Sequence, residues 1–429
     1  MRLTLTATLL AGSFLSLNAH ALDLLQVYRE ALVNDPVYAS ARATLAAGQE
    51  KETQGRAGLL PQVNASGARS RTELAQGASF LNNSYGITLS QPLFNWANWE
   101  LYQQGKLTTA ASEAQFAQAQ LDLIVRVSQA YFDVLAAQDT LASLQAQKVA
   151  ITEQLASAKR NFEVGTATIT DTHEAQARYD LAVAQELAAQ NDLDVKRNAL
   201  QQIIGKPAGE LAGLRPGVQI SAPSPAQIET WVESAEQQNY GVVGQKLTLE
   251  IARRDIGRNR AGHMPTVTMD VGRNYSDRSI SATNPSGYAN SAQVRFTMPL
   301  FSGFAVNSRV REAIALEDKA RNDLENARRT AAQGARQTYL GVTSGLAQVK
   351  ALEAAERSSQ SALESNRLGY QVGVRINIDV LNAQQQLYTT RQNLAKARYD
   401  TIMNGLKLKS TAGSLKEDDL TQVNGLLQH

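Results

Sequence analysis

The sequence predicts an α+β membrane protein built by internal tandem duplication, with two strand pairs and two very long helices. Three observations indicate this fold class. The same motifs recur about 200 residues apart. Prolines bound only short segments, and long proline-free stretches between them are rich in helix-forming residues. Aromatic residues make up only 6% of the chain, so we do not expect one large aromatic-filled core.

The N-terminus, residues 1–21, has the pattern of a cleavable secretory signal. It combines Arg2, an apolar run and a small-x-small ending at Ala19 and Ala21. A short membrane anchor fits less well, because the apolar run is shorter than the roughly 20 residues that a spanning helix needs. No later segment is apolar over that length, so we expect an exported protein without a transmembrane helix.

Composition argues against several classes of function. The chain has 42 basic and 40 acidic residues in mixed order, so no nucleic-acid partner is expected. Because cysteine is absent, disulfides and thiolate metal sites are excluded. No phosphate loop or nucleophile motif is present, which argues against an enzyme and a cofactor. No metal site is expected either, since the four histidines are scattered: His20, His173, His263 and His429.

The duplication divides the chain. The segment RAGLLPQVNASG at 56–67 matches RAGHMPTVTMDV at 260–271, and SQPLF at 90–94 matches TMPLF at 297–301. Four of the ten prolines crowd into 206–225, which we interpret as a linker. The predicted organisation is therefore a signal peptide at 1–21, a first repeat at 22–205, the linker, a second repeat at 226–412 and a C-terminal tail at 413–429.

Each repeat contains two segments that alternate as strands do, at about 61–73 and 83–94, then at about 265–277 and 289–301. In the first repeat Tyr85, Ile87 and Leu89 fall on one face, and small polar residues fall on the other. This pattern fits a sheet on a core or a barrel between lipid and water. Polar tips and strands of roughly 10 residues favour the barrel. Four strands cannot close one, so an oligomer is expected.

The helical stretches are unusually long. The first runs from Trp96 to about Phe162 without proline, which corresponds to a rod on the order of 100 Å. A return helix is predicted from about Asp171 to Ile204, and its repeat from about Asn377 to Ala412. Each repeat is thus predicted as helix, two strands, very long helix, glycine-containing turn and helix. Apolar residues near a 3.5-residue spacing fit either a wall of helices or a soluble coiled coil.

The two turns share a motif. Gly165 and Asp171 each lie 208 positions before Gly373 and Asp379. From the residues alone, a glycine here is most simply a helix C-cap and the aspartate a first-turn residue. The second copy differs by carrying Arg375 where the first copy has an alanine.

With these motifs in view, the chain resembles the TolC-type outer-membrane efflux protein family. The resemblance is most specific in YQVGVRINIDVLNAQQQLYTTRQNLAKARYDTIMNGLKLKSTAGSL at 370–415, in the paired QPLF and MPLF strands, and in the duplicated VG turns. It implies a homotrimer in which four strands per chain form one 12-stranded transmembrane β-barrel in outer-membrane lipid. A long periplasmic α-helical barrel of coiled-coil hairpins continues it, with a belt made by the linker and tail.

The function that the resemblance implies is a passive exit duct in the outer membrane, extending into the periplasm. It would export small toxic compounds, drugs or secreted proteins, the last by type I secretion. Docking with a periplasmic adaptor and an inner-membrane transporter of RND, ABC or MFS type would open it. The alternative is a soluble periplasmic coiled-coil adaptor, against which two equivalent strand pairs argue.

The resemblance also implies site residues at the turns. Tyr370 and Arg375 match the family's periplasmic gate, with Asp171 as their polar partner. These three residues are expected to hold the entrance shut, because an arginine can make charged hydrogen bonds to a neighbouring helix.

Two further sites follow from the same resemblance. Asp379 matches an acidic constriction, where three copies form a ring that attracts cations. Better-known members carry a second aspartate three residues later, and this chain has Asn382, which argues against a strong double-ring filter. Gly165 and Gly373 match the turns that contact the adaptor.

Overall fold

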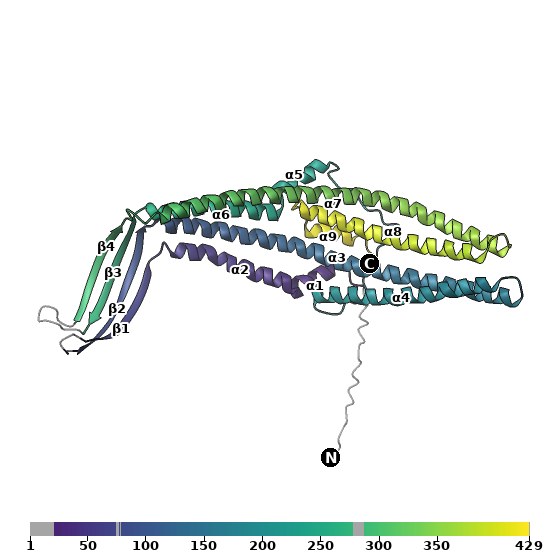
Figure 1. Cartoon of the computed structure of the whole chain (residues 1–429), viewed down its shortest axis with the longest axis horizontal. Coiled ribbons are helices and arrows are strands. Elements are labelled where there is room, and N and C mark those ends of the chain that lie inside the picture. The colour runs from purple at the N-terminus through teal and green to yellow at the C-terminus, as the bar shows by residue number, and fades with distance from the viewer. Residues whose placement is uncertain (1–20, 74–76, 78, 278–286, 429) are drawn as a thin grey trace, which may run out of the picture.

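The computed structural model describes residues 21–73, 77, 79–277 and 287–428, so the predicted signal peptide lies outside the described part except for Ala21. The chain forms a long helical rod with a sheet at one end and two hairpin tips at the other (Figure 1). This elongated shape explains why so few aromatic residues suffice, since no single large core is built.

The element order repeats, which confirms the predicted duplication. The first repeat comprises α1 (Leu24–Asn34), α2 (Pro36–Ala57), β1 (Gln62–Glu73), β2 (Ser79–Phe94), α3 (Trp96–Glu163) and α4 (Ile169–Ile204). The second comprises α5 (Ile228–Gln238), α6 (Tyr240–Arg260), a 3-10 turn (Ala261–His263), β3 (Thr266–Ser276), β4 (Gly287–Thr297), α7 (Ala305–Gln371) and α8 (Asn377–Thr411). The tail adds α9 (Glu417–Asn424).

The helices α3 and α7 run the whole length of the rod, and their partners change along it. Towards the sheet they pack with α2 and α6, and towards the tips with α4 and α8. Close approach of α2 and α3 depends on glycine, because a Cβ on Gly105 would lie 2.6 Å from the Lys51 carbonyl oxygen. None of the described helices combines the length and apolar character that crossing a bilayer requires.

The sheet is antiparallel in the order β1-β2-β3-β4. Its register aligns Val63, Leu89, Val271 and Ala292 in one row, so the apolar positions of all four strands share a face, as the alternation predicts. The strand predicted to reach 301 ends at Thr297 instead. Pro299, just beyond, has no backbone N–H to extend the ladder.

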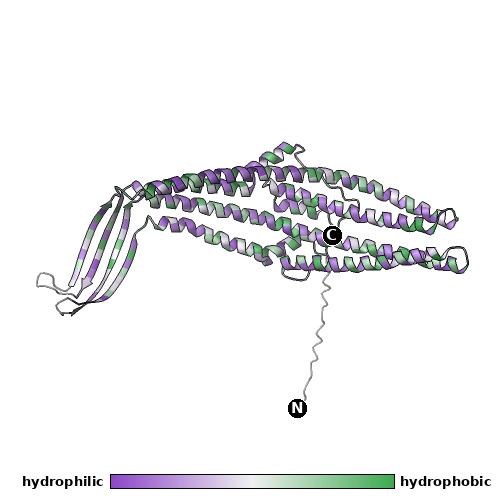
Figure 2. Cartoon of the chain, viewed as in Figure 1, coloured by the Kyte–Doolittle hydropathy of each residue, from purple (hydrophilic) through white to green (hydrophobic). Residues whose placement is uncertain are grey.

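The apolar face of the sheet is exposed in the single chain. Val63, Ile87, Val294 and Phe296 are all between 58% and 65% exposed. None of the described helices lies over this face as a second layer, and hydrophobic and hydrophilic residues alternate along the strands (Figure 2). A sheet packed on a core would bury such residues, so this face needs an apolar environment outside the chain.

The opposite face of the sheet is polar and internally bonded. Asp270 accepts a hydrogen bond from Ser90 Oγ at 2.8 Å and another from Gln293 Nε2 at 3.3 Å. These contacts join β2, β3 and β4 across one row. Side chains of this kind suit a water-filled interior.

A belt around the middle of the rod is formed by the linker, the tail and α1. Tyr131 of α3 is fully buried there, and its hydroxyl donates to the Ala212 carbonyl at 2.7 Å. Backbone bridges join Leu22 to Leu211 and Leu214 to Leu427. The predicted linker is therefore packed against the helices along part of its length and is not a loose tether.

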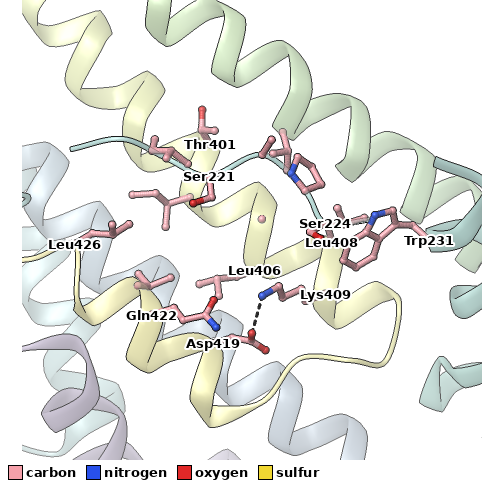
Figure 3. Close-up of a pocket in the computed structure, with 17 residues that line it drawn as sticks. Ser221, Ser224, Trp231, Thr401, Leu406, Leu408, Lys409, Asp419, Gln422 and Leu426 are labelled. Carbon is pink, nitrogen blue, oxygen red and sulfur yellow. Dashed lines mark hydrogen bonds and ion pairs between the residues drawn. The ribbon is translucent and has the colours of Figure 1, made fainter. Parts of the chain in front are cut away.

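One cavity of about 280 Å³ lies in this belt, between linker residues 220–224, Trp231, α8 and α9 (Figure 3). Its walls are mostly apolar, and at one side Lys409 Nζ contacts Asp419 Oδ1 at 2.6 Å. This ion pair ties α9 to α8, so it holds the tail against the helices.

Candidate functional site

Both hairpin turns have the same backbone, which sequence similarity between the copies predicts. Gly165 has φ 79° and Gly373 has φ 77°, a left-handed conformation that glycine adopts without strain. A Cβ at either position would touch nothing within 4 Å. Backbone geometry, and not crowding, therefore requires glycine. The two turns lie together at the end of the rod away from the sheet (Figure 1).

Apolar side chains project from the turns into solvent. Val164 is 73% exposed, Val372 64% and Val374 77%. Isolated exposed valines are common, but these three gather on two adjacent turns, and none of the described residues covers them. The tips thus present a small apolar surface.

Asp171, predicted as a gate partner, is engaged locally in this chain. Its Oδ2 accepts from the Thr168 backbone N–H at 3.1 Å and from Thr168 Oγ1 at 2.9 Å. Its own N–H donates to Thr168 Oγ1 at 3.3 Å. This reciprocal capping box starts α4 and is favoured by the helix dipole.

Arg375 and Asp379 are brought together by the structure. Arg375 Nη1 lies 3.6 Å from Asp379 Oδ2, one helical turn along at the start of α8. The aliphatic part of Arg375 lies over Gly369, where an added Cβ would be 2.7 Å from the arginine Cγ. The guanidinium is more than half exposed, so it remains accessible to a second chain.

Tyr370 links the two hairpins. Its hydroxyl accepts a hydrogen bond from Asn161 Nδ2 at 3.1 Å, and its ring packs beside a small apolar cluster containing Leu363 and Val380. Among the described residues no hydrogen bond joins Tyr370 to Asp171. The tyrosine of the second copy is therefore bound to the end of α3, not to the start of α4.

Asn377 is a functional candidate that sequence reasoning missed. Its side chain is 1% exposed at the start of α8. Its Oδ1 accepts from Gln154 Nε2 of α3, and its Nδ2 donates to the Asp171 carbonyl of α4 at 3.2 Å. One amide thus bonds both helices of the other hairpin. The available signal was the contrast with the first copy, which has Ile169 at the equivalent position.

Asn382 has a partner across the hairpins as well. Arg178 of α4 donates from Nη2 to Asn382 Oδ1 at 3.0 Å and from Nη1 to Gln385 Oε1. The side-chain amide of Asn382 is therefore bound to an arginine of the other hairpin. Hydrogen bonds of the side-chain amides of Asn161, Asn377 and Asn382 join the two hairpins at the tips.

Nearer the belt, α3 and α8 are joined by a hydrogen bond between Asp139 and Tyr399. Tyr399 Oη donates to Asp139 Oδ2 at 2.6 Å. Burial raises the pKa of Asp139, while the Tyr399 hydroxyl and the charge of Arg398 oppose the shift. Burial and the neighbouring Asp139 raise the pKa of Tyr399. Arg398 itself pairs with Glu353 of α7 at 2.7 Å, so three helices meet at this point.

The architecture defines a class of protein before any comparison is made. A sheet with one apolar exposed face, one polar face and two unpaired edges, carried on a rod of hairpins, is a subunit of a membrane channel. The family described as "Outer membrane efflux protein" matches residues 27–206 and 231–414, and the chain belongs to that family. The two matched segments fall on the two repeats.

Similar proteins agree with this assignment. Outer membrane protein TolC of Vibrio cholerae is 34% identical over 412 residues, covering 95% of this chain and 94% of the relative. Alkaline protease secretion protein AprF of Pseudomonas aeruginosa is 33% identical over 433 residues, covering 97% and 90%. The crystal structure of outer membrane protein VceC from Vibrio cholerae has a TM-score of 0.80 at 18% identity, covering 91% and 96%, which supports the fold.

The family membership fixes the general function. The chain is a passive outer-membrane channel that extends into the periplasm and serves as an exit duct, and it is not an enzyme. Channels of this type work with a periplasmic adaptor and an inner-membrane pump. The alternative of a soluble adaptor is not supported, because the relatives match along nearly the whole chain.

Proposed function

We propose that three copies of the chain close one 12-stranded barrel and one periplasmic tunnel. The observation that carries this proposal is the open sheet. β1 and β4 are its edges, and each leaves a row of backbone N–H and C=O groups unpaired. Such edges are not tolerated in lipid, where no water can satisfy them. Pairing β4 of one copy with β1 of the next removes every edge.

The helical rod supports the same assembly. Exposed apolar side chains lie on the part of α7 beyond the belt, at Leu340 and Leu368, and on α4, at Leu187 and Val195. In one chain α4 and α7 are both outer helices of the tip half, since α3 and α8 lie between them. Adjacent copies would cover these side chains by placing α7 beside α4.

Within this tunnel the turn of the second repeat, at Gly373, forms the periplasmic gate of each chain. Arg375 is exposed beyond its pair with Asp379, so it can reach a neighbouring copy. Asp171 of that copy offers a carboxylate whose Oδ1 carries no hydrogen bond among the described residues. Tyr370 holds the end of α7 against α3.

The constriction ring consists of three copies of Asp379. Converging carboxylates attract cations, but each one here has an arginine 3.6 Å away. Asn382 adds no charge and is bound to Arg178. We therefore propose a single, partly neutralised ring with modest cation preference.

The adaptor docks on the turns that contain Gly165 and Gly373. The exposed valines beside these glycines provide an apolar contact that a hairpin tip of a partner can cover. The pump behind the adaptor, of RND, ABC or MFS type, selects the cargo. Small toxic compounds and drugs fit the family description, and secreted proteases fit the names of two relatives.

Cross-linking tests the assembly, because the natural chain has no cysteine. Asn64→Cys on β1 and Ser291→Cys on β4 are combined, and neighbouring β1 positions are sampled to find the register. We expect disulfide-linked dimers and trimers on denaturing gels. Asn64→Cys with Thr88→Cys is the control, since these residues pair within one chain and yield only cross-linked monomers. If no β1 position forms linked oligomers, the trimer proposal is wrong.

A further inference from the structure

An arginine lies on the apolar face of the sheet. The register places Arg273 of β3 in one row with Ala65, Ile87 and Asn290. On the same face, the next row towards the helices contains Val271, so apolar side chains lie on the side of Arg273 that is nearer the helices. A charged side chain on the lipid face of a barrel destabilises it unless the charge reaches a polar partner near the interface. Such a residue is therefore a candidate binding site.

Three tyrosines mark the interface next to this arginine. Tyr85, Tyr275 and Tyr288 form the following row, away from the helices. The rings of Tyr85 and Tyr275 stack with centroids 4.7 Å apart, and the hydroxyls of Tyr85 and Tyr288 are 3.3 Å apart. Aromatic girdles of this kind lie at the boundary between hydrocarbon and headgroups. Since the helices extend into the periplasm, this boundary belongs to the outer leaflet.

The arginine points to the girdle and has no acidic partner among the described residues. Its guanidinium carbon lies 4.7 Å from the centroid of the Tyr288 ring, a cation–π contact. Other charges nearby are already engaged. Arg71 pairs with Glu73 at 3.2 Å, and Asp277 accepts from the Asn83 backbone N–H at 2.6 Å. The guanidinium of Arg273 is thus held against the tyrosine row.

We propose that Arg273, stacked on Tyr288, binds a phosphate on the headgroup of an outer-leaflet glycolipid. A guanidinium offers two parallel donors that match phosphate oxygens. Tyr288 fixes the plane of the guanidinium. The acyl chains of the same lipid lie over Ile87 and Val271. This inference rests on the proposed barrel, because only closure turns the apolar face outward to lipid.

Native mass spectrometry of the purified full-length protein in detergent, titrated with lipid A, measures this binding. We expect Arg273→Gln to weaken binding about tenfold, as loss of a charge-assisted hydrogen bond would. Arg273→Lys is expected to fall between Arg273→Gln and the natural protein, because it keeps the charge and loses the bidentate geometry. The same lipid without its phosphates should bind the natural protein as weakly as lipid A binds Arg273→Gln.

Arg295→Gln is the matched control. Arg295 lies on β4 opposite Thr268, on the other face of the sheet, and is also exposed. It should bind lipid A as the natural protein does. The proposal is overturned if Arg273→Gln binds normally, if Arg295→Gln loses as much affinity, or if phosphate removal has no effect. The β1–β4 cross-links report separately on the trimer, so failure of the barrel and failure of the lipid site are distinguishable.

Discussion

At the scale of single residues, one buried amide bonds both helices of the neighbouring hairpin. Asn377 bonds Gln154 and the Asp171 carbonyl, and both partners belong to the other hairpin. Because these partners are neutral groups, this link does not titrate and is screened little by salt. The neutral hydrogen bonds of Asn377 therefore differ from the exposed ion pair of Arg375 and Asp379, which carries charge.

Replacing this amide by the residue of the first copy should loosen the entrance. Asn377→Ile removes both hydrogen bonds to the other hairpin, at about 0.5–1.5 kcal/mol each. We expect higher closed-state conductance of single channels in planar bilayers. Asn366→Ile is the control, since Asn366 is half-buried and its side chain donates to the Ala362 carbonyl of its own helix. Equal conductance in the Asn377 variant and the natural protein would contradict the role of this amide.

At the scale of helices and strands, most of the framework could be predicted from the sequence. Proline positions and alternation locate the strand pairs, and proline-free stretches locate α3 and α7. The break between α1 and α2 has a local signal, because Asp35 caps α2 and Pro36 begins it. The matching break between α5 and α6 has only Asn239, which caps Gly241 at 2.9 Å, so the sequence predicts a single helix there.

The contacts between hairpins could not be predicted in this way. Asn377, Arg178 and Asn161 meet their partners because of how α3, α4, α7 and α8 are rotated about their axes. This rotation depends on packing along the whole rod, and a local sequence pattern does not encode it. The sequence thus identifies Tyr370, Arg375 and Asp379 by resemblance, but not the amides that bond across the tips.

The junction of α3 and α8 at Asp139 should make stability depend on pH. Because burial raises the pKa of Asp139, the folded protein favours the protonated acid. The contribution of Asp139 to folding stability is then greatest at low pH and falls as pH rises from the unfolded pKa, near 3.8, through the raised folded pKa. Asp139→Asn should remove this dependence, so the variant is expected to be more stable than the natural protein at neutral pH.

Thermal unfolding midpoints between pH 4 and 8 test this expectation. Because the Asp139 residue also contacts solvent, the effect should be smaller than the roughly 1.4 kcal/mol per pKa unit of a fully buried acid. Asp133→Asn serves as the control, because Asp133 is on the same helix and pairs with Lys196 of α4 at 3.9 Å. It should follow the natural profile. If the midpoint of the natural protein does not fall as pH rises, or falls equally in Asp139→Asn, this acid does not govern the stability of the junction.

At the scale of the whole molecule, the proposed trimer makes charge at the entrance a property of three chains together. Asp379→Asn should lower the cation preference of the channel and leave Arg375 to attract anions, so the reversal potential in a salt gradient should move towards zero or change sign. Asp180→Asn is the control, since Asp180 is exposed on α4 and bonds Gln176 of its own helix. An unchanged reversal potential for Asp379→Asn would exclude a ring at this position.

The exchange of partners along α3 and α7 has a consequence for how such a protein can change. The short helices α2 and α6 serve only the membrane half, whereas α4 and α8 serve only the tip half. If the adaptor docks on the tips as proposed, substitutions on α4 and α8 can alter which export machinery the chain recruits without disturbing its anchorage. The belt of linker and tail separates the two halves, so the tip half can diverge during evolution while the membrane half stays the same.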